Sequence, residues 1–417
     1  MMSAARSPRR STKRPLAEWA LRGGLAALAG VLGVVSTMQT AAFAIRKSNI
    51  ERAYALAPND GRIAGELAEQ IAAGTPLADQ RARSTLLARQ ALIDEALAVP
   101  ALTALALNVQ LRGDTAAARK LFVHSDALSR RELGTRLWLI EDAVGRNDVA
   151  GALHHYDIAL RTEKAAPALL FPILSEAISD PALAQALSTT IAARPPWSEA
   201  FIGYLAAVNK APVVSSVFLR RLAERGVPIS QAAQISMVNA LVNSGKLEDG
   251  WAYYASFHKG VARDRSRDPE FVSSVETPAA FDWVPVANDT GISASIQSLA
   301  KGGVFDFAAS STVGGAVLQQ TQLLPSGRYR LEGVSAGISQ ALGERPYWQL
   351  ICTDGREIGH VEMPASDQNG GRFAGDMAVG ADCPAQMLRL VIRPSSNIGG
   401  VSGQIERVQL VPAIQGR

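Results

Sequence analysis

The sequence predicts a multidomain chain in which an apolar N-terminal segment is followed by an all-α half and then by a β-sandwich. Residues 23–45 contain no charged residue. Residues 46–268 are rich in Ala and Leu, carry apolar residues at helical spacing and lack strand-like alternation. From residue 281 onwards, short alternating runs are separated by Gly, Pro, Asn and Asp, which is typical of an all-β domain.

The apolar segment 23–45 is the predicted transmembrane helix. At 1.5 Å per residue it would be roughly 34 Å long, enough to cross the hydrocarbon core of a bilayer. Residues 1–22 form a basic tail with six cations and one acid, whereas only two cations follow the segment directly. This asymmetry predicts an uncleaved anchor with a cytoplasmic tail and a body outside the cytoplasm. A cleaved signal peptide is the alternative, because "AFA" at 42–44 resembles a signal-peptidase site.

Composition and motifs exclude several classes of function. The net charge of +4 lies largely in the tail, and no basic patch with interleaved aromatic residues follows it, so we expect no nucleic-acid partner. The chain has no HExxH, GxSxG or Walker motif and no GxGxxG placed between a strand and a helix. Its two cysteines belong to no CxxC or Cys/His cluster. We therefore expect no catalytic residue, no metal site and no cofactor.

A 34-residue repeat is the most specific signal in the helical half. Gly113 and Asn147 stand 34 residues apart at equivalent positions, and Gly245 begins a third copy. Five positions on, each copy has a small residue, and nine positions on it has an aromatic residue. Small residues let paired helices approach closely, the aromatic fills the gap between hairpins, and Gly or Asn turns the chain. The predicted repeat-packing residues are Gly113, Ala118, Phe122, Asn147, Ala152, Tyr156, Gly245 and Tyr254.

This spacing resembles that of the tetratricopeptide (TPR) repeat, although the period is lost between Pro167 and Ala232. We expect a degenerate array of five or six helical hairpins. The register also bears on the adjacent His154 and His155, which align with Lys120 and Leu121 in the first copy. Because neighbouring helix residues point about 100° apart, we interpret the two histidines as scaffold residues and not as metal ligands or catalytic bases.

Residues 269–280 are predicted to be a linker, and residues 281–414 a β-sandwich of jelly-roll type with eight strands about ten residues apart. Cys352 and Cys383 lie 31 residues apart within it. In an exported body, an oxidising compartment favours a disulfide between them. Two buried free thiols are the alternative.

Alternation assigns the side chains of these strands to two faces. Trp348, Leu350 and Cys352 are predicted to point inward, so Tyr347 and Gln349 point outward. If the strands are neighbours, outward arginines lie on the same face, where guanidinium groups suit the carboxylates of an acidic polysaccharide. An ordinary solvated face is the alternative. The candidate glycan-binding residues are Arg330, Tyr347, Gln349, Arg389 and Arg393.

The combination of a basic tail, one membrane helix, TPR-like hairpins and a sandwich resembles a family of bacterial membrane-anchored envelope proteins associated with exopolysaccharide production. "RLWLIEDAVGRNDVAGALHHYDIALR" carries the resemblance in the helical part. "RYRLEG", "YWQLIC", "DCPAQMLRLVIR" and "GQIERVQLV" resemble a galactose-binding-like carbohydrate module. The resemblance supplies no catalytic residues.

The resemblance implies a non-catalytic adaptor or scaffold in polysaccharide assembly or export. It would be anchored in the bacterial inner membrane with its body in the periplasm. The helical array would bind a protein of the envelope polysaccharide machinery, and the sandwich would bind glycan. A periplasmic polysaccharide lyase or hydrolase with the sandwich as its catalytic unit is the alternative, and a purely structural protein is a third possibility.

Overall fold

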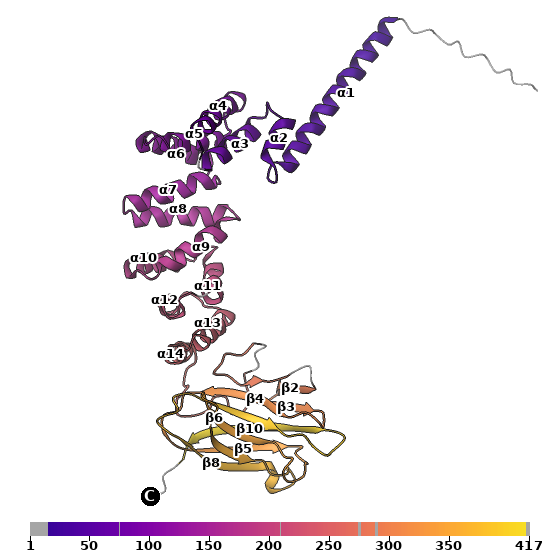
Figure 1. The fold of residues 1–417 in the computed structure, drawn as a ribbon, viewed down its shortest axis with the longest axis vertical. Coiled ribbons are helices and arrows are strands. Elements are labelled where there is room, and N and C mark those ends of the chain that lie inside the picture. The colour runs from indigo at the N-terminus through magenta and orange to yellow at the C-terminus, as the bar shows by residue number, and fades with distance from the viewer. Residues whose placement is uncertain (1–15, 75, 209, 274–276, 288–290, 414–417) are drawn as a thin grey trace, which may run out of the picture. The chain divides into compact units, whose positions relative to one another are not determined.

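The computed structural model describes residues 16–413 except 75, 209, 274–276 and 288–290. Residues 1–15 of the predicted basic tail lie outside the described residues. The described part of the chain forms fourteen α-helices followed by ten β-strands (Figure 1), which confirms the predicted order of an α part and a β part. It divides into two compact units, Met1–Leu170 and Phe171–Arg417, so the division falls within the helical array and not at the predicted linker.

The first unit begins with a helix that, over Glu18–Ile45, is long and apolar enough to span a membrane. A signal sequence near the N-terminus can have the same length and composition, so both identities fit this helix. A short helix and then three helical hairpins follow it in the same unit. The first hairpin consists of the helices Gly61–Ala73 and Ala78–Asp94. A Cβ atom at Gly61 would lie 2.7 Å from the carbonyl oxygen of Ala91, so only glycine fits where the first of these helices begins beside the end of the second. The helices are α1 (Leu16–Ile45), α2 (Ile50–Leu56), α3 (Gly61–Ala73), α4 (Ala78–Asp94), α5 (Val99–Gln110), α6 (Thr115–Leu128), α7 (Leu133–Gly145) and α8 (Val149–Thr162), and α9 (Ala166–Ala177) contains the division between the units.

Equivalent turns confirm the 34-residue register. Gly113 and Asn147 both have positive φ angles, 88° and 57°, which glycine adopts freely and asparagine more readily than most residues. The following Asp114 and Asp148 cap α6 and α8 in the same way, by accepting a hydrogen bond from the backbone N–H three residues on. The predicted packing residues of both copies are buried: Ala118, Phe122, Ala152 and Tyr156.

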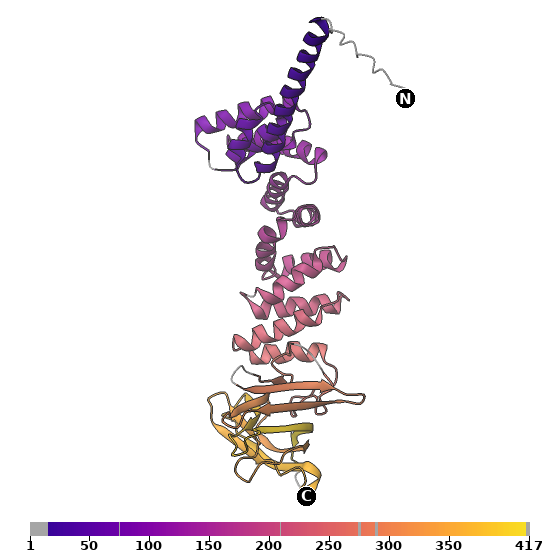
Figure 2. The same cartoon turned by 90° about the vertical axis from the view of Figure 1, so that its right-hand side faces the viewer.

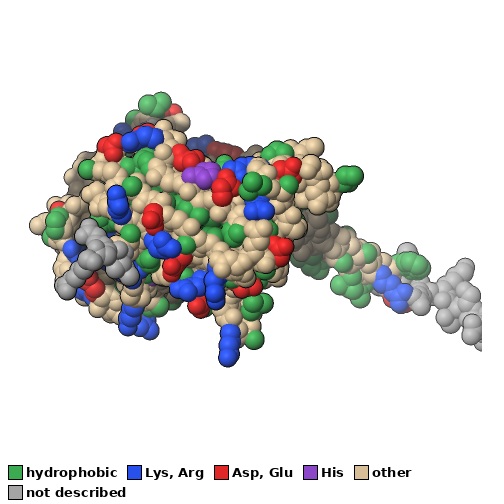
Figure 3. Space-filling view, turned by 90° about the horizontal axis from the view of Figure 1, so that it is seen from below, with side chains coloured by type: hydrophobic (Ala, Val, Ile, Leu, Met, Phe, Trp, Pro, Cys, Tyr) green, Lys and Arg blue, Asp and Glu red, His purple; other side chains and the backbone are tan. Residues whose placement is uncertain are grey.

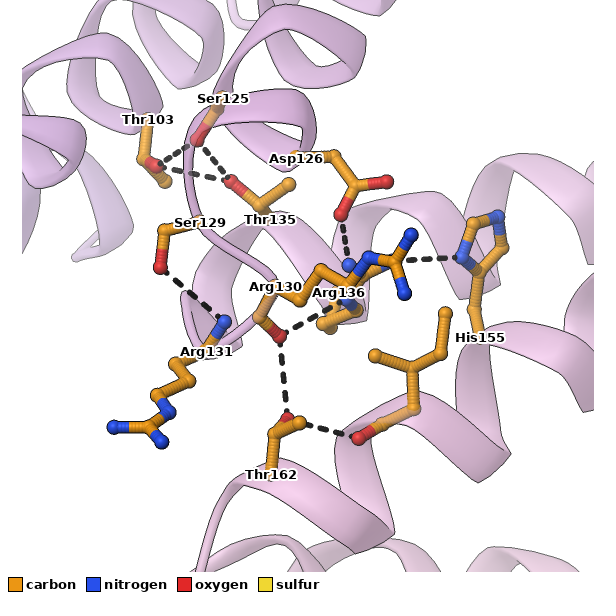
Figure 4. Close-up of polar contacts among 11 residues, drawn as sticks. Thr103, Ser125, Asp126, Ser129, Arg130, Arg131, Thr135, Arg136, His155 and Thr162 are labelled. Atoms are coloured by element: carbon orange, nitrogen blue, oxygen red, sulfur yellow. Dashed lines mark hydrogen bonds and ion pairs between the residues drawn. The ribbon is translucent and has the colours of Figure 1, made fainter.

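Polar side chains are also buried between these hairpins (Figure 4). Arg136 of α7 is 1% exposed, forms an ion pair with Asp126 and donates to the carbonyl oxygen of Arg130 over 3.3 Å. Its Nη1 atom lies 3.2 Å from Nδ1 of His155 on α8. Burial, followed by the positive charge of Arg136, lowers the pKa of His155. His155 thus contacts a cation within the helical packing.

The second unit continues the helical array, and its helices stack as successive layers beside the sandwich (Figure 2). The loss of the sequence period between Pro167 and Ala232 does not interrupt the helices. Gly245 has a φ of 74°, and Tyr254 is buried, as the third copy of the repeat predicts. The helices are α10 (Pro181–Ala192), α11 (Ser198–Ala207), α12 (Pro212–Glu224), α13 (Gln231–Asn243) and α14 (Leu247–Phe257).

The β part is a sandwich of two five-stranded antiparallel sheets, with orders β1-β4-β9-β6-β7 and β2-β3-β10-β5-β8. Successive strands from β3 to β10 change sheet at every connection except the β6–β7 hairpin, and these eight are the predicted strands of the jelly roll. The structure adds β1 and β2 at one edge of each sheet. The strands are β1 (Val284–Pro285), β2 (Ile292–Ser298), β3 (Gly303–Ala309), β4 (Gly315–Gln322), β5 (Gly327–Ala336), β6 (Tyr347–Cys352), β7 (Glu357–Glu362), β8 (Arg372–Val379), β9 (Gln386–Ile392) and β10 (Val401–Pro412).

The segment predicted as a linker, residues 269–280, packs against both halves of the second unit. Phe271 is fully buried in the core between the two sheets. Asn239 of α13 accepts a hydrogen bond from the backbone N–H of Ala280 over 2.8 Å. Its amide also donates to the carbonyl oxygen of Pro278 over 3.4 Å. The described part of this segment therefore joins α13 to the sandwich.

Candidate functional site

A row of polar side chains crosses the outer face of the sheet β1-β4-β9-β6-β7. The strand registers place Gln319 of β4 opposite Arg389 of β9, Arg389 opposite Gln349 of β6, and Gln349 opposite His360 of β7. Because side chains directly opposite each other in a sheet share a face, this register forms a continuous row of amide, guanidinium, amide and imidazole groups. Three of the four are half-buried, and His360 is exposed.

An aromatic cluster lies next to this row. The ring of Tyr347 stacks on the ring of His360 with centroids 4.5 Å apart and an interplanar angle of 16°. The guanidinium carbon of Arg393 lies 4.1 Å from the centroid of the same Tyr347 ring. Arg393 also holds Glu362 through two hydrogen bonds of 2.9 and 2.5 Å. Nε2 of His360 lies 2.9 Å from the same carboxylate.

The charges of this cluster are balanced internally. Hydrogen bonding from Arg393, with a further contribution from His360, lowers the pKa of Glu362 to about 2. Glu362 therefore stays ionised at any ordinary pH and neutralises Arg393. Arg389 differs, because its Nε atom is buried and has no hydrogen-bond partner within the described part of the chain. A buried donor without a partner is costly, which makes Arg389 a candidate to bind a further group at this place.

The structure brings together four of the five predicted glycan-binding residues. Tyr347, Gln349, Arg389 and Arg393 belong to β6, β9 and the residue directly after β9 on one sheet. Arg330 lies on β5 of the other sheet, where its Nη1 atom forms a 3.3 Å ion pair with Asp376. The condition that the strands are neighbours is therefore not met for Arg330, because β5 and β6 belong to different sheets.

The inward half of the predicted pattern is confirmed. Trp348, Leu350 and Cys352 are buried in the sandwich, and Cys352 forms a disulfide with Cys383. Trp283 is 3% exposed and packs edge-to-face against Trp348 with ring centroids 5.8 Å apart. It is part of the core and offers no exposed platform for a sugar.

Sequence reasoning missed His360, Glu362 and Gln319 as members of this face. His360 and Glu362 alternate with the buried Val361, so period-two spacing alone would have placed them outward. The contact between Glu362 and Arg393 could not be predicted from this spacing, because it depends on the strand order β9-β6-β7. Figure 3 shows acidic, basic and apolar side chains intermingled over the part of the sandwich seen from below.

Apart from this sheet face, a cavity lies where α13 and α14 meet the chain that enters the sandwich. It is a cavity of about 420 Å³ whose walls include Tyr254, His258 and Asp282. The Tyr254 hydroxyl donates to Oδ1 of Asp282 over 2.6 Å, and the backbone N–H of Ala279 donates to Oδ2 over 3.0 Å. Both carboxylate oxygens thus hold the chain in place, so we interpret this wall as a structural joint.

No residues are positioned as an obvious metal site in the described part of the chain. Groups of three or more His, Cys, Asp or Glu side chains that could hold a metal ion do not occur there. The rings of His154 and His155 are tilted by 58° with centroids 5.6 Å apart, and His155 contacts Arg136. A metal ion at His155 would have to compete with a guanidinium cation.

Comparison with known proteins gives little further guidance. No protein-family model and no curated protein matches the chain. Among solved structures, the enzymatically active domain of tailspike protein 4 from bacteriophage CBA120 aligns at 11% identity and a TM-score of 0.23, over 31% of this chain and 19% of that one. The Glycosylation Associate Protein (Gap123) complex from Streptococcus agalactiae aligns at 12% identity and a TM-score of 0.20, over 29% of this chain and 39% of that one. This chain thus spans well under half the length of either protein, and similarities this low assign neither a family nor an activity.

Proposed function

We propose that this protein is a non-catalytic, membrane-anchored adaptor of envelope polysaccharide assembly or export, and that the outer face of the sheet β1-β4-β9-β6-β7 binds an acidic glycan. The observation that carries the proposal is that the buried Nε of Arg389 has no hydrogen-bond partner among the described residues, within the row formed with Gln319, Gln349 and His360. The resemblance to envelope proteins associated with exopolysaccharide supports the same role.

The chemistry of the row favours a sugar carboxylate over a neutral hydroxyl at its centre. A guanidinium group presents donors in a planar fork that matches a carboxylate, and charge-assisted hydrogen bonds are the stronger kind. Gln319 and Gln349 flank Arg389 with amides that can donate to and accept from hydroxyl groups on both sides. Arg393 cannot take this role without giving up Glu362. We therefore propose Arg389, and not Arg393, as the anion-binding residue.

The helical array is the proposed site for a protein partner. A hollow of about 730 Å³ on α11 and α13 is lined by uncharged side chains, among them Gln231, Ser236 and Asn243. Asn239 in the same hollow already binds main-chain groups of Pro278 and Ala280. Amide side chains that bind backbone in this way suit an extended polypeptide, so the partner would present such a segment to the hollow.

Binding of a uronate-containing polysaccharide to the full-length protein in lipid nanodiscs tests the glycan proposal. The same polysaccharide with its carboxyl groups reduced to alcohols is the matched ligand. We expect the acidic form to bind at least tenfold more tightly and Arg389→Met to abolish that preference. Arg328→Met is the matched control, because Arg328 is exposed on β5 of the other sheet and should leave affinity unchanged.

Two results would contradict the proposal. Equal affinity of wild type and Arg389→Met for the acidic polysaccharide would remove Arg389 from the site. Shortening of the polysaccharide during incubation with the protein would favour a lyase or hydrolase over an adaptor. The size distribution of the recovered polysaccharide, measured by size-exclusion chromatography, distinguishes the two functions.

A further inference from the structure

Helix α4 and the turn after it expose three large aliphatic side chains in the first unit. Leu86 is 67% exposed, Ile93 is 78% exposed, and Leu97 in the turn after the helix is 68% exposed. Leu86 and Ile93 are two helical turns apart and share one face. Ser84, Ala88 and Ala91, on the opposite face of α4, are buried.

The way α1 joins the first unit determines how far α4 lies from a bilayer that surrounds α1. The α1 side chains from Trp19 to Ala41 are exposed, and Ala42 is fully buried in a cluster with residues of α2 and α3. The twenty residues of 23–42 would span about 30 Å as a helix, which is the thickness of the hydrocarbon core of a bilayer. The protein packing of α1 therefore begins where a bilayer around this apolar stretch would end.

Short contacts hold the end of α1 against the first hairpin. The Arg46 guanidinium lies 4.9 Å from the centroid of the Phe43 ring, and both Arg46 and Lys47 pair with Glu66 of α3 over 3.7 Å. Helix α4 packs directly against α3, and Figure 1 draws it on the side of the first unit from which α1 departs. The exposed row of α4 consequently lies close to the level at which α1 leaves the apolar layer.

We propose that Leu86, Ile93 and Leu97 dock into the surface of the same bilayer that holds α1, at the boundary between lipid headgroups and acyl chains. Exposed Arg89, one turn from both Leu86 and Ile93, would reach the lipid phosphates. A row of Leu and Ile flanked by Arg is the composition of helices that lie in the membrane interface. The proposal rests on the membrane anchoring proposed above, and commits to lipid and not to a protein as the occupant.

Fluorescence quenching in the full-length protein tests this docking. Cys352 and Cys383 are joined in a disulfide, so a cysteine introduced elsewhere is the only reactive thiol. An environment-sensitive fluorophore is attached to Leu86→Cys or to Ile93→Cys in phosphatidylglycerol–phosphatidylcholine liposomes. Val144→Cys on α7 is the matched control, because Val144 is 61% exposed in the same unit. Val31→Cys in α1 reports whether the anchor is inserted.

We expect lipids spin-labelled near the headgroup to quench fluorophores at 86 and 93 at least threefold more than at 144, and aqueous iodide to show the reverse order. If position 31 is quenched by lipid while 86 and 93 are as open to iodide as 144, the docking is wrong and the anchor stands. If position 31 is also open to iodide, both fail. Shielding of 86 and 93 from iodide without lipid quenching would mean a protein contact and would likewise overturn the lipid proposal.

Discussion

The hydroxyl of Tyr254 donates a hydrogen bond to Asp282 over 2.6 Å and thereby joins the last helix of the array to the chain that enters the sandwich. Burial, followed by the nearby carboxylate of Asp282, raises the pKa of Tyr254, so the hydroxyl keeps its proton. The Tyr254 ring stacks on His258 at 4.0 Å and meets Phe281 edge-on at 5.5 Å. Helices and sheets of the second unit should consequently unfold together.

Replacing Arg267 should make the helices and the sheets of the second unit unfold in separate transitions. Its buried guanidinium donates to the carbonyl oxygen of Phe281 over 2.7 Å, to Gln322 over 3.1 Å, and to the carbonyl oxygen of Thr321. Arg267→Met would leave these acceptors unpaired in a buried place, at a cost of about 3 kcal/mol. We expect calorimetry to show a lower Tm and two transitions in place of one for the second unit.

The control for that experiment is Arg265→Met. Arg265 is nearly half exposed, and among the described residues its ion pair is with its neighbour Asp264 over 2.9 Å. A surface ion pair of this kind contributes little, so the variant should keep the wild-type Tm and a single transition. Equal destabilisation by both variants would show that Arg267 has no special part in the joint.

The disulfide should stabilise the sandwich and leave the first unit unaffected. The Cys352–Cys383 bond closes a loop with a sequence separation of 31, and its loss in Cys352→Ala/Cys383→Ala should cost roughly 3–4 kcal/mol. Calorimetry with and without a reductant measures the stability that the disulfide contributes. The double variant should match the reduced wild type, and a reductant should shift the double variant no further. A stability loss in the first unit would contradict the assignment.

The two turns of the repeat should respond differently to substitution. Gly113 has a φ of 88°, so Gly113→Val forces a β-branched residue into a left-handed conformation at a cost of about 1–2 kcal/mol. Asn147→Gly should leave stability within about 0.5 kcal/mol of wild type, because glycine adopts the φ of 57° freely. Gly145→Ala, at a helix end with open space around it, is the control and should not destabilise. Urea denaturation separates these outcomes.

A half-buried pair of carboxyl groups predicts a pH dependence of the first unit. Burial, followed by the neighbouring Glu132, raises the pKa of Glu69 to about 9, and burial also raises the pKa of Glu132. Above the ordinary glutamate pKa of roughly 4.5, the unfolded chain has lost a proton that the folded chain keeps. The equilibrium constant for unfolding should therefore rise by up to about tenfold per pH unit as the pH increases towards 9.

Glu69→Gln is the matched variant for this prediction. An amide is neutral at every pH, so the variant should lose most of the slope between about pH 5 and 9 and be more stable than wild type at pH 8. Urea denaturation at four or five pH values measures the slope. Parallel pH curves for the two proteins would place the titrating group elsewhere.

The elements that sequence patterns predicted are those governed by neighbours along the chain. Gly113 and Asn147 could be aligned because both precede an Asp cap and both need a left-handed turn. The strands β3 to β10 could be recognised because their side chains alternate. The two-residue β1 offers no pattern of any length, and β2 has the weak alternation Ile292, Ala294, Ile296 at a sheet edge.

What could not be predicted depends on pairing between distant segments. Alternation gives the face of a strand but not its sheet, which is why Arg330 was placed with Arg389. Arg267 resembles any charged residue of a polar connection, yet its partners Gln320 and Gln322 lie more than fifty positions away. Likewise, no sequence pattern indicates that the Nε of Arg389 is buried without a hydrogen-bond partner in the part of the chain that the structure describes, because this depends on packing in three dimensions.

The buried end of α1 has a mechanical consequence. A domain tethered by a flexible linker explores a volume that grows with linker length. Here the turn between Ile45 and Ile50 is closed by hydrogen bonds from the Ser48 and Asn49 backbones to Ile45, so no slack separates the apolar helix from the first hairpin. With α1 in a bilayer, the first unit could move only by tilting and by lateral diffusion. The first unit would contact other proteins at a fixed distance from the membrane surface. A partner would therefore need its binding surface at that same distance, in addition to a matching chemistry.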